Sequence, residues 1–178
     1  MVEGLKPSIG KVSIGLGHCL FKLAKWMLRH GLSIRYYAIS ASELEKLVKS
    51  QIGCPCWLWD GKYWFTDSET WKKIISKDFT EQIKYLAEKR DCDNISAIFK
   101  AHISEYFDMN GVGITVGEVK DSKTNQLVGY HAWNTLICQK RGKPTLYFLE
   151  PQLDLLAKAQ QGVQIGEWKY YAYFILWY

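Results

Sequence analysis

The apolar residues of this chain change their spacing once, and that change limits the folds the chain can adopt. Before Asn110-Gly111 they recur every three or four residues, and the longest such stripe belongs to a helix that begins at Asp91: Ile95, Ile98, Phe99, His102, Ile103 and Tyr106. After this point they alternate with polar residues, which predicts strands at 112–120, 129–138, 145–150 and 168–177. Helices first and antiparallel strands afterwards indicate an α+β domain with a C-terminal antiparallel sheet.

Capping and turn signatures predict further elements upstream. A capping box formed by Ser40 and Glu43 opens a helix. Three more elements are expected after it in chain order: a short aromatic hairpin or extended segment over 57–65 that turns at Asp60-Gly61, a helix opened by Thr66-Asp67-Ser68-Glu69, and a short helix over 80–88.

The first 36 residues differ from the rest, so we expect a separate segment at 1–36 ahead of a domain at 37–178. Over 18–30, apolar residues recur at helical spacing, Lys22, Lys25 and Arg29 supply charge, and Gly31 supplies a stop. This pattern predicts a basic amphipathic helix. Such a helix either packs against the rest of the protein or docks on a membrane surface or in a partner's groove.

The composition excludes several classes of protein. Of 178 residues, 48% are hydrophobic and 23% charged, which provides for a core and rules out wholesale disorder. The net charge is +5, but Lys and Arg are spread from Lys6 to Lys169, so we expect no nucleic-acid partner. No stretch approaches the ~20 apolar residues of a membrane span, and no convincing signal peptide is present, so the expected location is cytoplasmic. The five cysteines are an odd number, which argues against a disulfide framework.

Cys92 is the cysteine best placed for chemistry. It lies three residues before Ile95, so it continues the apolar stripe while occupying the first turn of the expected helix. The helix dipole and the unpaired N–H groups there lower a thiol pKa and can hold an oxyanion. Asp91 and Asp93 oppose the effect because nearby negative charge disfavours a thiolate, so a cationic partner is required.

His131 and Glu150 lie on the two strands that follow. If 139–142 form a four-residue hairpin loop, Cys138 faces Lys143, and His131 stands directly across from Glu150. A shift of the register by two residues keeps both groups on one face of the sheet, whereas a shift by one separates them. The imidazole would then be oriented by a carboxylate and could serve a thiol.

Together these three residues have the composition of a nucleophilic triad, with Cys92 as nucleophile, His131 as base and Glu150 as the orienting acid. Packing roles for the same residues remain open from the pattern alone. Cys54 is a rival nucleophile, but a proline follows it and no helix begins there. His102 lies in the apolar stripe and is expected to be a core histidine.

Three separated motifs in this order resemble the papain-like cysteine protease domain at the C-terminus of the Marasmius oreades agglutinin and its microbial relatives. They are Asp91-Cys92-Asp93-Asn94 with the residues that follow, Gly129-Tyr130-His131-Ala132-Trp133-Asn134, and Leu149-Glu150-Pro151-Gln152. With the upstream segment 63–75, the resemblance covers roughly residues 57–153. It implies a papain-like fold, a peptide or protein substrate, and a Cys92, His131 and Glu150 triad with Gln152 and Trp133 in contact with substrate.

The resemblance also implies that calcium could activate the protein, although no cofactor is required by the sequence. The metal ligands are unknown, and Asp91 and Asp93 are only candidates. The chain departs from the family in having no lectin domain, in Tyr130 where relatives tend to have Gly, and in its basic N-terminal helix.

Two alternatives stay open for function. The His-Ala-Trp run followed by a strand acid also looks like the transglutaminase-like superfamily, which uses the same order of residues and transfers the acyl group to an amine instead of water. The other alternative is a catalytically inactive binding module that keeps the fold. We therefore expect a cysteine peptidase or related thiol acyl-hydrolase that forms a thioester, with these two as rivals.

Overall fold

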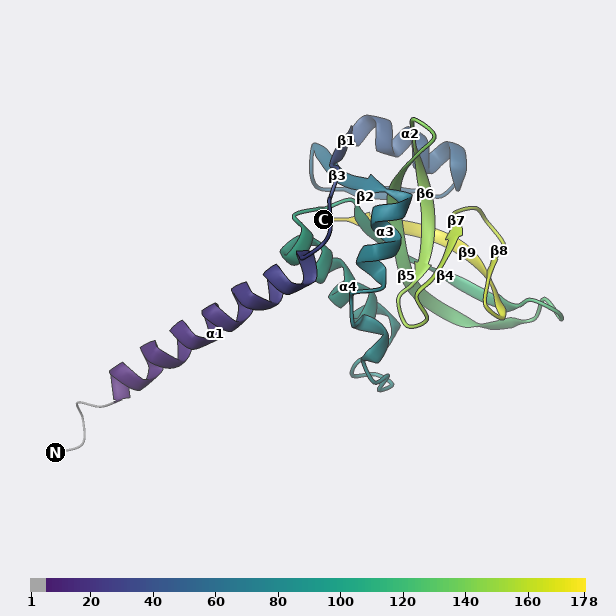
Figure 1. The fold of residues 1–178 in the computed structure, drawn as a ribbon. Coiled ribbons are helices and arrows are strands. Elements are labelled where there is room, and N and C mark those ends of the chain that lie inside the picture. The colour runs from purple at the N-terminus through teal and green to yellow at the C-terminus, as the bar shows by residue number, and fades with distance from the viewer. Residues whose placement is uncertain (1–5) are drawn as a thin grey trace. The chain divides into compact units, whose positions relative to one another are not determined.

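The computed structural model describes the backbone of residues 6–178 and the side chains of residue 17 and of residues 19–178. Figure 1 shows its elements. The described residues fall into two compact units, divided between Leu32 and Ser33. The first unit holds helix α1 (Lys6–Arg29), whose last part is the helix expected at 18–30. None of the helices in residues 6–178 carries the long apolar run that a membrane crossing requires.

The second unit is an α+β domain in which, among the described residues, nine strands form one mixed sheet. Its helical elements are α2 (Ala41–Gln51), α3 (Ser68–Ile75), the short 3-10 helix η1 (Thr80–Gln82) and α4 (Cys92–Phe107). Its strands are β1 (Tyr37–Ser40), β2 (Cys56–Leu58), β3 (Lys62–Asp67), β4 (Val112–Asp121), β5 (Leu127–Lys140), β6 (Lys143–Glu150), β7 (Leu155–Lys158), β8 (Val163–Ile165) and β9 (Trp168–Trp177). The main path runs β1-β3-β5-β4-β9-β2, while β6 joins β5 to β7 and β8 pairs with β9.

The α+β class is confirmed, and the strands expected in the C-terminal half pair antiparallel with one another, but the sheet as a whole is mixed. Strand β2 pairs in parallel with β9, and β3 pairs in parallel with β5. Of the two forms expected over 57–65, the hairpin is wrong and the extended segment that turns at Asp60-Gly61 is present, because its two arms pair with other strands instead of each other. Asn110 holds this segment in place: it accepts from Trp64 N at 2.7 Å and donates to Asp60 Oδ2 at 2.8 Å. The short helix expected at 80–88 is reduced to η1.

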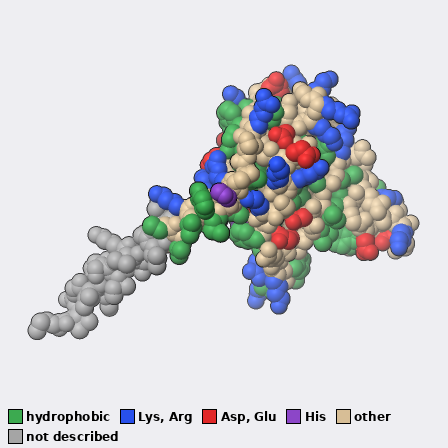
Figure 2. All heavy atoms as spheres, viewed as in Figure 1, with side chains coloured by type: hydrophobic (Ala, Val, Ile, Leu, Met, Phe, Trp, Pro, Cys, Tyr) green, Lys and Arg blue, Asp and Glu red, His purple; other side chains and the backbone are tan. Residues whose placement is uncertain are grey.

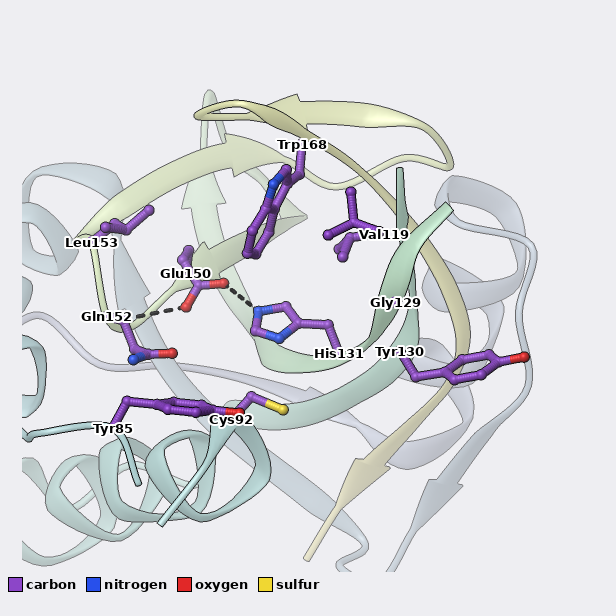
Figure 3. A pocket seen from close by; sticks show the side chains of 11 residues that line it. Tyr85, Cys92, Val119, Gly129, Tyr130, His131, Glu150, Gln152, Leu153 and Trp168 are labelled. Carbon is purple, nitrogen blue, oxygen red and sulfur yellow. Dashed lines mark hydrogen bonds and ion pairs between the residues drawn. The ribbon is translucent and has the colours of Figure 1, made fainter. Parts of the chain in front are cut away.

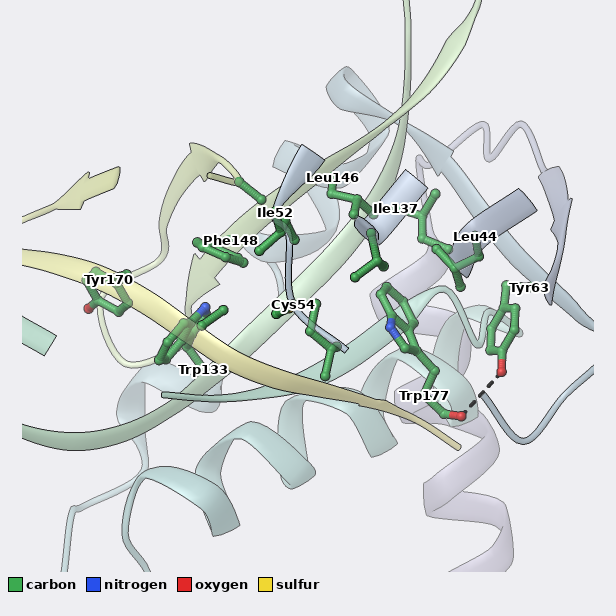
Figure 4. Close-up of a cluster of buried hydrophobic side chains, with 14 of the residues drawn as sticks. Leu44, Ile52, Cys54, Tyr63, Trp133, Ile137, Leu146, Phe148, Tyr170 and Trp177 are labelled. Carbon is green, nitrogen blue, oxygen red and sulfur yellow. Dashed lines mark hydrogen bonds between the residues drawn. The ribbon is translucent and has the colours of Figure 1, made fainter. Parts of the chain in front are cut away.

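Helix α2 begins where its capping box predicts. Ser40 N donates to Glu43 Oε2 at 3.0 Å, and Glu43 N donates to Ser40 Oγ at 3.3 Å. Its inner face buries Leu44 and Val48 in a large apolar core, shown in Figure 4. At its end, Gln51 donates to the carbonyl of Leu146 at 2.7 Å and accepts from its N–H at 3.0 Å, which fixes strand β6 against the helix.

Helix α4 carries the apolar stripe expected from its sequence and packs against β4 and β5. Ile95, Phe99 and Ile103 are buried, and Asn134 of β5 donates to the carbonyl of Ser96 at 3.0 Å. His102 is half-buried at the side of this stripe, where its Nδ1 lies 2.8 Å from Asp78 Oδ1. The hydrogen bond from Asn134 holds the beginning of α4 against β5, the strand that also carries His131.

The hairpin between β5 and β6 is tighter than expected. A two-residue turn, Arg141 (φ 49°) and Gly142 (φ 78°), replaces the four-residue loop, so Lys140 faces Lys143 and Asn134 faces Leu149. Both turn residues have positive φ, as in the turns that match the twist of a β-hairpin. The register therefore differs by two residues from the expected one. Direct opposition of His131 and Glu150 is wrong, but the two side chains keep the same face of the sheet.

Candidate active site

Helix α4 begins at Cys92, with Asp91 as its N-cap residue. Asp91 N donates to Asn94 Oδ1 at 3.3 Å, and this bond fixes the first turn of the helix, which contains Cys92. Cys92 is half-buried there. A hydrogen bond with His131 lowers the pKa of Cys92 below its usual value, a backbone hydrogen bond from Ala132 adds to this, and partial burial opposes both. The thiol expected from the sequence as nucleophile is thus the one whose ionised form is favoured.

His131 lies between Cys92 and Glu150. Its Nε2 donates to Glu150 Oε2 at 2.7 Å, as Figure 3 shows, and its other ring nitrogen faces the thiol. Burial alone would lower the pKa of His131, but the hydrogen bonds with Cys92 and Glu150 outweigh it and raise the pKa to about 9. A lowered thiol pKa beside a raised imidazole pKa favours a thiolate and imidazolium pair near neutral pH.

Glu150 is a buried carboxylate with three donors around it. Its Oε2 accepts from His131 and from Tyr170 Oη at 3.0 Å, and its Oε1 accepts from the Gln152 backbone N–H at 3.3 Å. Only 3% of Glu150 is exposed, so these contacts replace the water that the carboxylate loses. Burial and the nearby carboxylate raise the pKa of Tyr170, so its hydroxyl remains a donor.

Aromatic rings fix the plane of the imidazole. Trp168 meets the His131 ring edge-on at 5.7 Å between centroids, Tyr170 does so at 6.0 Å, and Trp133 stacks beside it at 6.1 Å. Trp133 is fully buried and also packs on Phe148, so it does not line the pocket and has no exposed surface to offer a substrate. Its ring supports the imidazole from the side.

A pocket of about 400 Å³ opens above the three residues. Figure 3 shows Gln152 and Tyr85 on the side of the thiol and Trp168 beside Glu150. The rest of the wall is mostly apolar: Val119, Val128, Gly129, Tyr130 and Leu153. Gln152, which the resemblance implied to contact substrate, lies on the wall of this pocket. The sequence reasoning missed Tyr170 and Trp168, although their alternation along the last strand could have identified both as facing one side of the sheet.

The other thiols in the domain differ from Cys92 in their environment. Burial raises the pKa of Cys54 to about 11 and that of Cys138 to about 12. The pKa of Cys56 is also raised, again because of burial. In this domain Cys92 alone combines a lowered pKa, a histidine partner and a place in a pocket. This contrast separates it from Cys54, the rival nucleophile.

The residues around Cys92 offer few ligands for calcium. Asp91 and Asp93 share a hydrogen bond, which together with their mutual repulsion raises the pKa of Asp91. Within the described part of the chain, no group of three or more His, Cys, Asp or Glu side chains is arranged to hold a metal ion. Calcium takes six to eight oxygen ligands, and two carboxylates do not amount to such a set. We assign no catalytic step to calcium.

Comparison with known proteins shows that the fold of this chain is similar to that of two solved structures. No protein-family model and no curated protein matches the chain. The solved E64 complex of PSL1a is similar over 78% of this chain and 51% of its own, with 20% identity and a TM-score of 0.57. Polyporus squamosus lectin bound to a human-type influenza-binding epitope is similar over 78% and 49%, with 19% identity and a TM-score of 0.53. The chain thus spans about half the length of these structures and shares the papain-like fold of PSL1a.

Proposed function

We propose that the protein is a cysteine peptidase or related thiol acyl-hydrolase that cleaves peptide or isopeptide bonds through a thioester. The observation that carries this proposal is the convergence of Cys92, His131 and Glu150 in one pocket, with the pKa of the thiol lowered and that of the imidazole raised. The likeness to PSL1a in its E64 complex supports it, because it concerns the fold that would hold the three residues.

In the first half of the reaction, the Cys92 thiolate attacks the carbonyl carbon of the substrate and a carbon–sulfur bond forms. The carbonyl electrons move to oxygen and give a tetrahedral oxyanion. When the oxyanion collapses, the carbon–nitrogen bond breaks, and the His131 imidazolium gives its proton from the nitrogen that faces the thiol to the departing amine. A thioester on Cys92 and a neutral His131 remain.

In the second half, His131 acts as a base. It removes a proton from water, the hydroxide attacks the thioester carbon, and the sulfur leaves as a thiolate beside the renewed imidazolium. Glu150 stabilises the imidazolium at the beginning and the end of the cycle and holds the ring in the orientation that both proton transfers need. Because Glu150 keeps its hydrogen bonds from Tyr170 and from Gln152 N, it remains an acceptor throughout.

The oxyanion can be held by donors at the start of α4. The first backbone N–H groups of a helix have no partner within the helix, and they carry the positive end of its dipole. Cys92 supplies one of them, next to its own sulfur. The side chain of Gln152, on the wall of the same pocket, is the candidate for a second donor. Such donors act most strongly on the charge that develops in the transition state.

The test is active-site labelling followed by turnover. E64, an epoxide that alkylates nucleophilic thiols, is incubated with the protein at pH 6, and the modified residue is located by mass spectrometry. We expect one adduct, on Cys92, absent in Cys92→Ala and His131→Ala and retained in Cys54→Ala. Hydrolysis of a mixed peptide library should follow the same pattern. Hydrolysis that persists in Cys92→Ala would refute the assignment, and labelling without hydrolysis or amine transfer would identify an inactive module.

The same library separates hydrolysis from acyl transfer. With a primary amine added, a transglutaminase-like enzyme would release amide products in place of free acids, because the amine takes the place of water at the thioester. We expect free acids to predominate.

A further inference from the structure

The positive charge of the chain belongs to its first 36 residues. Lys and Arg occur along the whole chain, but Asp and Glu do not. Residues 1–36 hold six of the 23 Lys and Arg and one of the 18 Asp and Glu, while residues 37–178 hold 17 of each. The domain is therefore neutral, and the net charge of +5 lies in this segment, within which residues 4–36 contain no carboxylate side chain. The proposed catalysis uses none of these residues.

Apolar and basic residues lie on opposite faces of the described part of α1. Leu20, Leu23 and Met27 recur at helical spacing on one face. Three basic residues repeat that spacing two positions later: Lys22, Lys25 and Arg29. Because successive residues of a helix are about 100° apart, a shift of two positions turns the side chain by about 200°, to the opposite face. The helix therefore carries an apolar stripe along one side and a cationic stripe along the other.

Within the first unit, the apolar stripe is exposed. Leu20, Leu23 and Met27 retain 58%, 51% and 59% of their surface, and Trp26 retains 59%. Figure 2 shows hydrophobic and basic side chains next to each other in this part of the helix. The Trp26 ring contacts His30 at 4.8 Å between centroids, one turn further along. A contiguous exposed apolar stripe of this kind marks a surface that binds something.

We propose that α1 binds an anionic lipid surface and lies along it. Its 24 residues extend over about 36 Å. In this position Leu20, Leu23 and Met27 enter the boundary between headgroups and acyl chains, and the basic side chains reach back to the phosphates along their flexible stems. Trp26, between the two faces, has the amphipathic ring that favours the headgroup level.

Charge complementarity selects this partner over a protein groove. All formal side-chain charge on residues 4–36 has one sign, and it is distributed along the segment and not confined to one end. An anionic membrane meets such a stripe along its whole length, with each basic side chain near the surface contributing separately to the attraction. A groove would need acidic residues in matching positions as well as apolar pockets. The consequence is that the neutral domain with its pocket is held at a membrane surface.

Sedimentation of the full chain with lipid vesicles tests the proposal, and it needs no enzymatic activity. One set of vesicles is phosphatidylcholine alone, and the other contains phosphatidylglycerol in equal proportion. We expect binding to the anionic set and little to the neutral set, with binding weakened by added salt. Lys22→Gln, Lys25→Gln and Arg29→Gln together should weaken the partition to anionic vesicles about 100-fold. Leu23→Ser with Met27→Ser should weaken it at both low and high salt.

Matched substitutions in the domain serve as controls. Lys72→Gln with Lys73→Gln removes helical charge from α3, and Leu86→Ser with Leu127→Ser removes exposed apolar side chains; both should bind as the unmodified chain does. Equal binding to both kinds of vesicle would overturn the role of charge. Absence of binding to either would overturn the proposal and leave packing against the domain or a protein groove as the role of α1.

Discussion

Replacing Glu150 with Gln tests how the carboxylate controls the imidazole. The substitution keeps the size of the side chain but removes its charge, and the amide can no longer accept on both ends. Glu150 Oε2 lies 2.7 Å from His131 Nε2, and its Oε1 accepts from Gln152 N. Whichever way the introduced amide points, its NH2 group faces an N–H donor. We expect lower turnover without unfolding, since the substituted side chain fits the same space.

The size of the effect follows from the hydrogen bond that is lost. A hydrogen bond to a charged group contributes about 1.5–3 kcal/mol, and one pKa unit corresponds to about 1.4 kcal/mol. The pKa of His131, raised to about 9 by Cys92 and Glu150 together, should therefore fall by about 1–2 units in Glu150→Gln. Contacts that stabilise the cation raise the imidazole pKa. The imidazolium is therefore present below this pKa and is lost above it. The high-pH limit of activity should move down by the same amount.

Nuclear magnetic resonance of the His131 ring nitrogens against pH measures this shift directly. His131→Ala assigns the signal among the four histidines, and the high-pH limb of kcat/KM gives an independent reading. Glu69→Gln, which changes an exposed carboxylate on α3, is the matched control and should leave the titration unchanged. A His131 titration in Glu150→Gln that coincides with that of the unmodified protein would refute the reasoning.

Three further substitutions test the packing of the sheet near the site, the shielding of His131 and the choice of nucleophile. Gly117→Ala should destabilise the domain by about 3 kcal/mol in urea unfolding, because an added Cβ would come within 2.0 Å of the Tyr171 carbonyl oxygen; unchanged stability would contradict this close packing. Trp168→Ala should lower kcat/KM about tenfold, since water would reach the His131 hydrogen bond that the indole edge covers, and an unaltered pH profile with full activity would argue against shielding. Cys54→Ala should retain kcat/KM within about twofold, because burial keeps that thiol protonated, and a large loss of turnover would make it a rival nucleophile again.

The sequence was sufficient for the start of α2, for the buried stripe of α4 and for the face of the sheet on which His131 and Glu150 lie. The Ser40 and Glu43 capping box and the stripe of α4 depend on neighbours three or four residues apart, so local pattern predicts them well. The loop length predicted between β5 and β6 was wrong by two residues, but the predicted contact between His131 and Glu150 is still present, because a shift of two residues keeps both side chains on the same face of the sheet. Cβ atoms two positions off register are still within reach of an imidazole and a long carboxylate side chain.

What the sequence could not supply depends on contacts between distant segments. The arms on either side of Asp60-Gly61 look like a hairpin, yet each pairs with a strand more than seventy residues further along the chain. The burial of Trp133 follows from residues on β6 and β9 that surround it. Tyr170 of β9 reaches Glu150 of β6 although β4 and β5 separate these strands in the sheet order, a proximity that no local pattern encodes.

In the proposed mechanism, Cys92 is ionised at a pH where an ordinary thiol is protonated, because His131 stands beside it as a cation. The ultraviolet absorbance of the thiolate, taken as the difference between the unmodified protein and Cys92→Ala across a pH titration, measures this most directly. We predict a thiolate signal from Cys92 that appears well below pH 9 and moves to higher pH in His131→Ala. A Cys92 thiolate that forms only at or above pH 9, with no change in His131→Ala, would contradict the account.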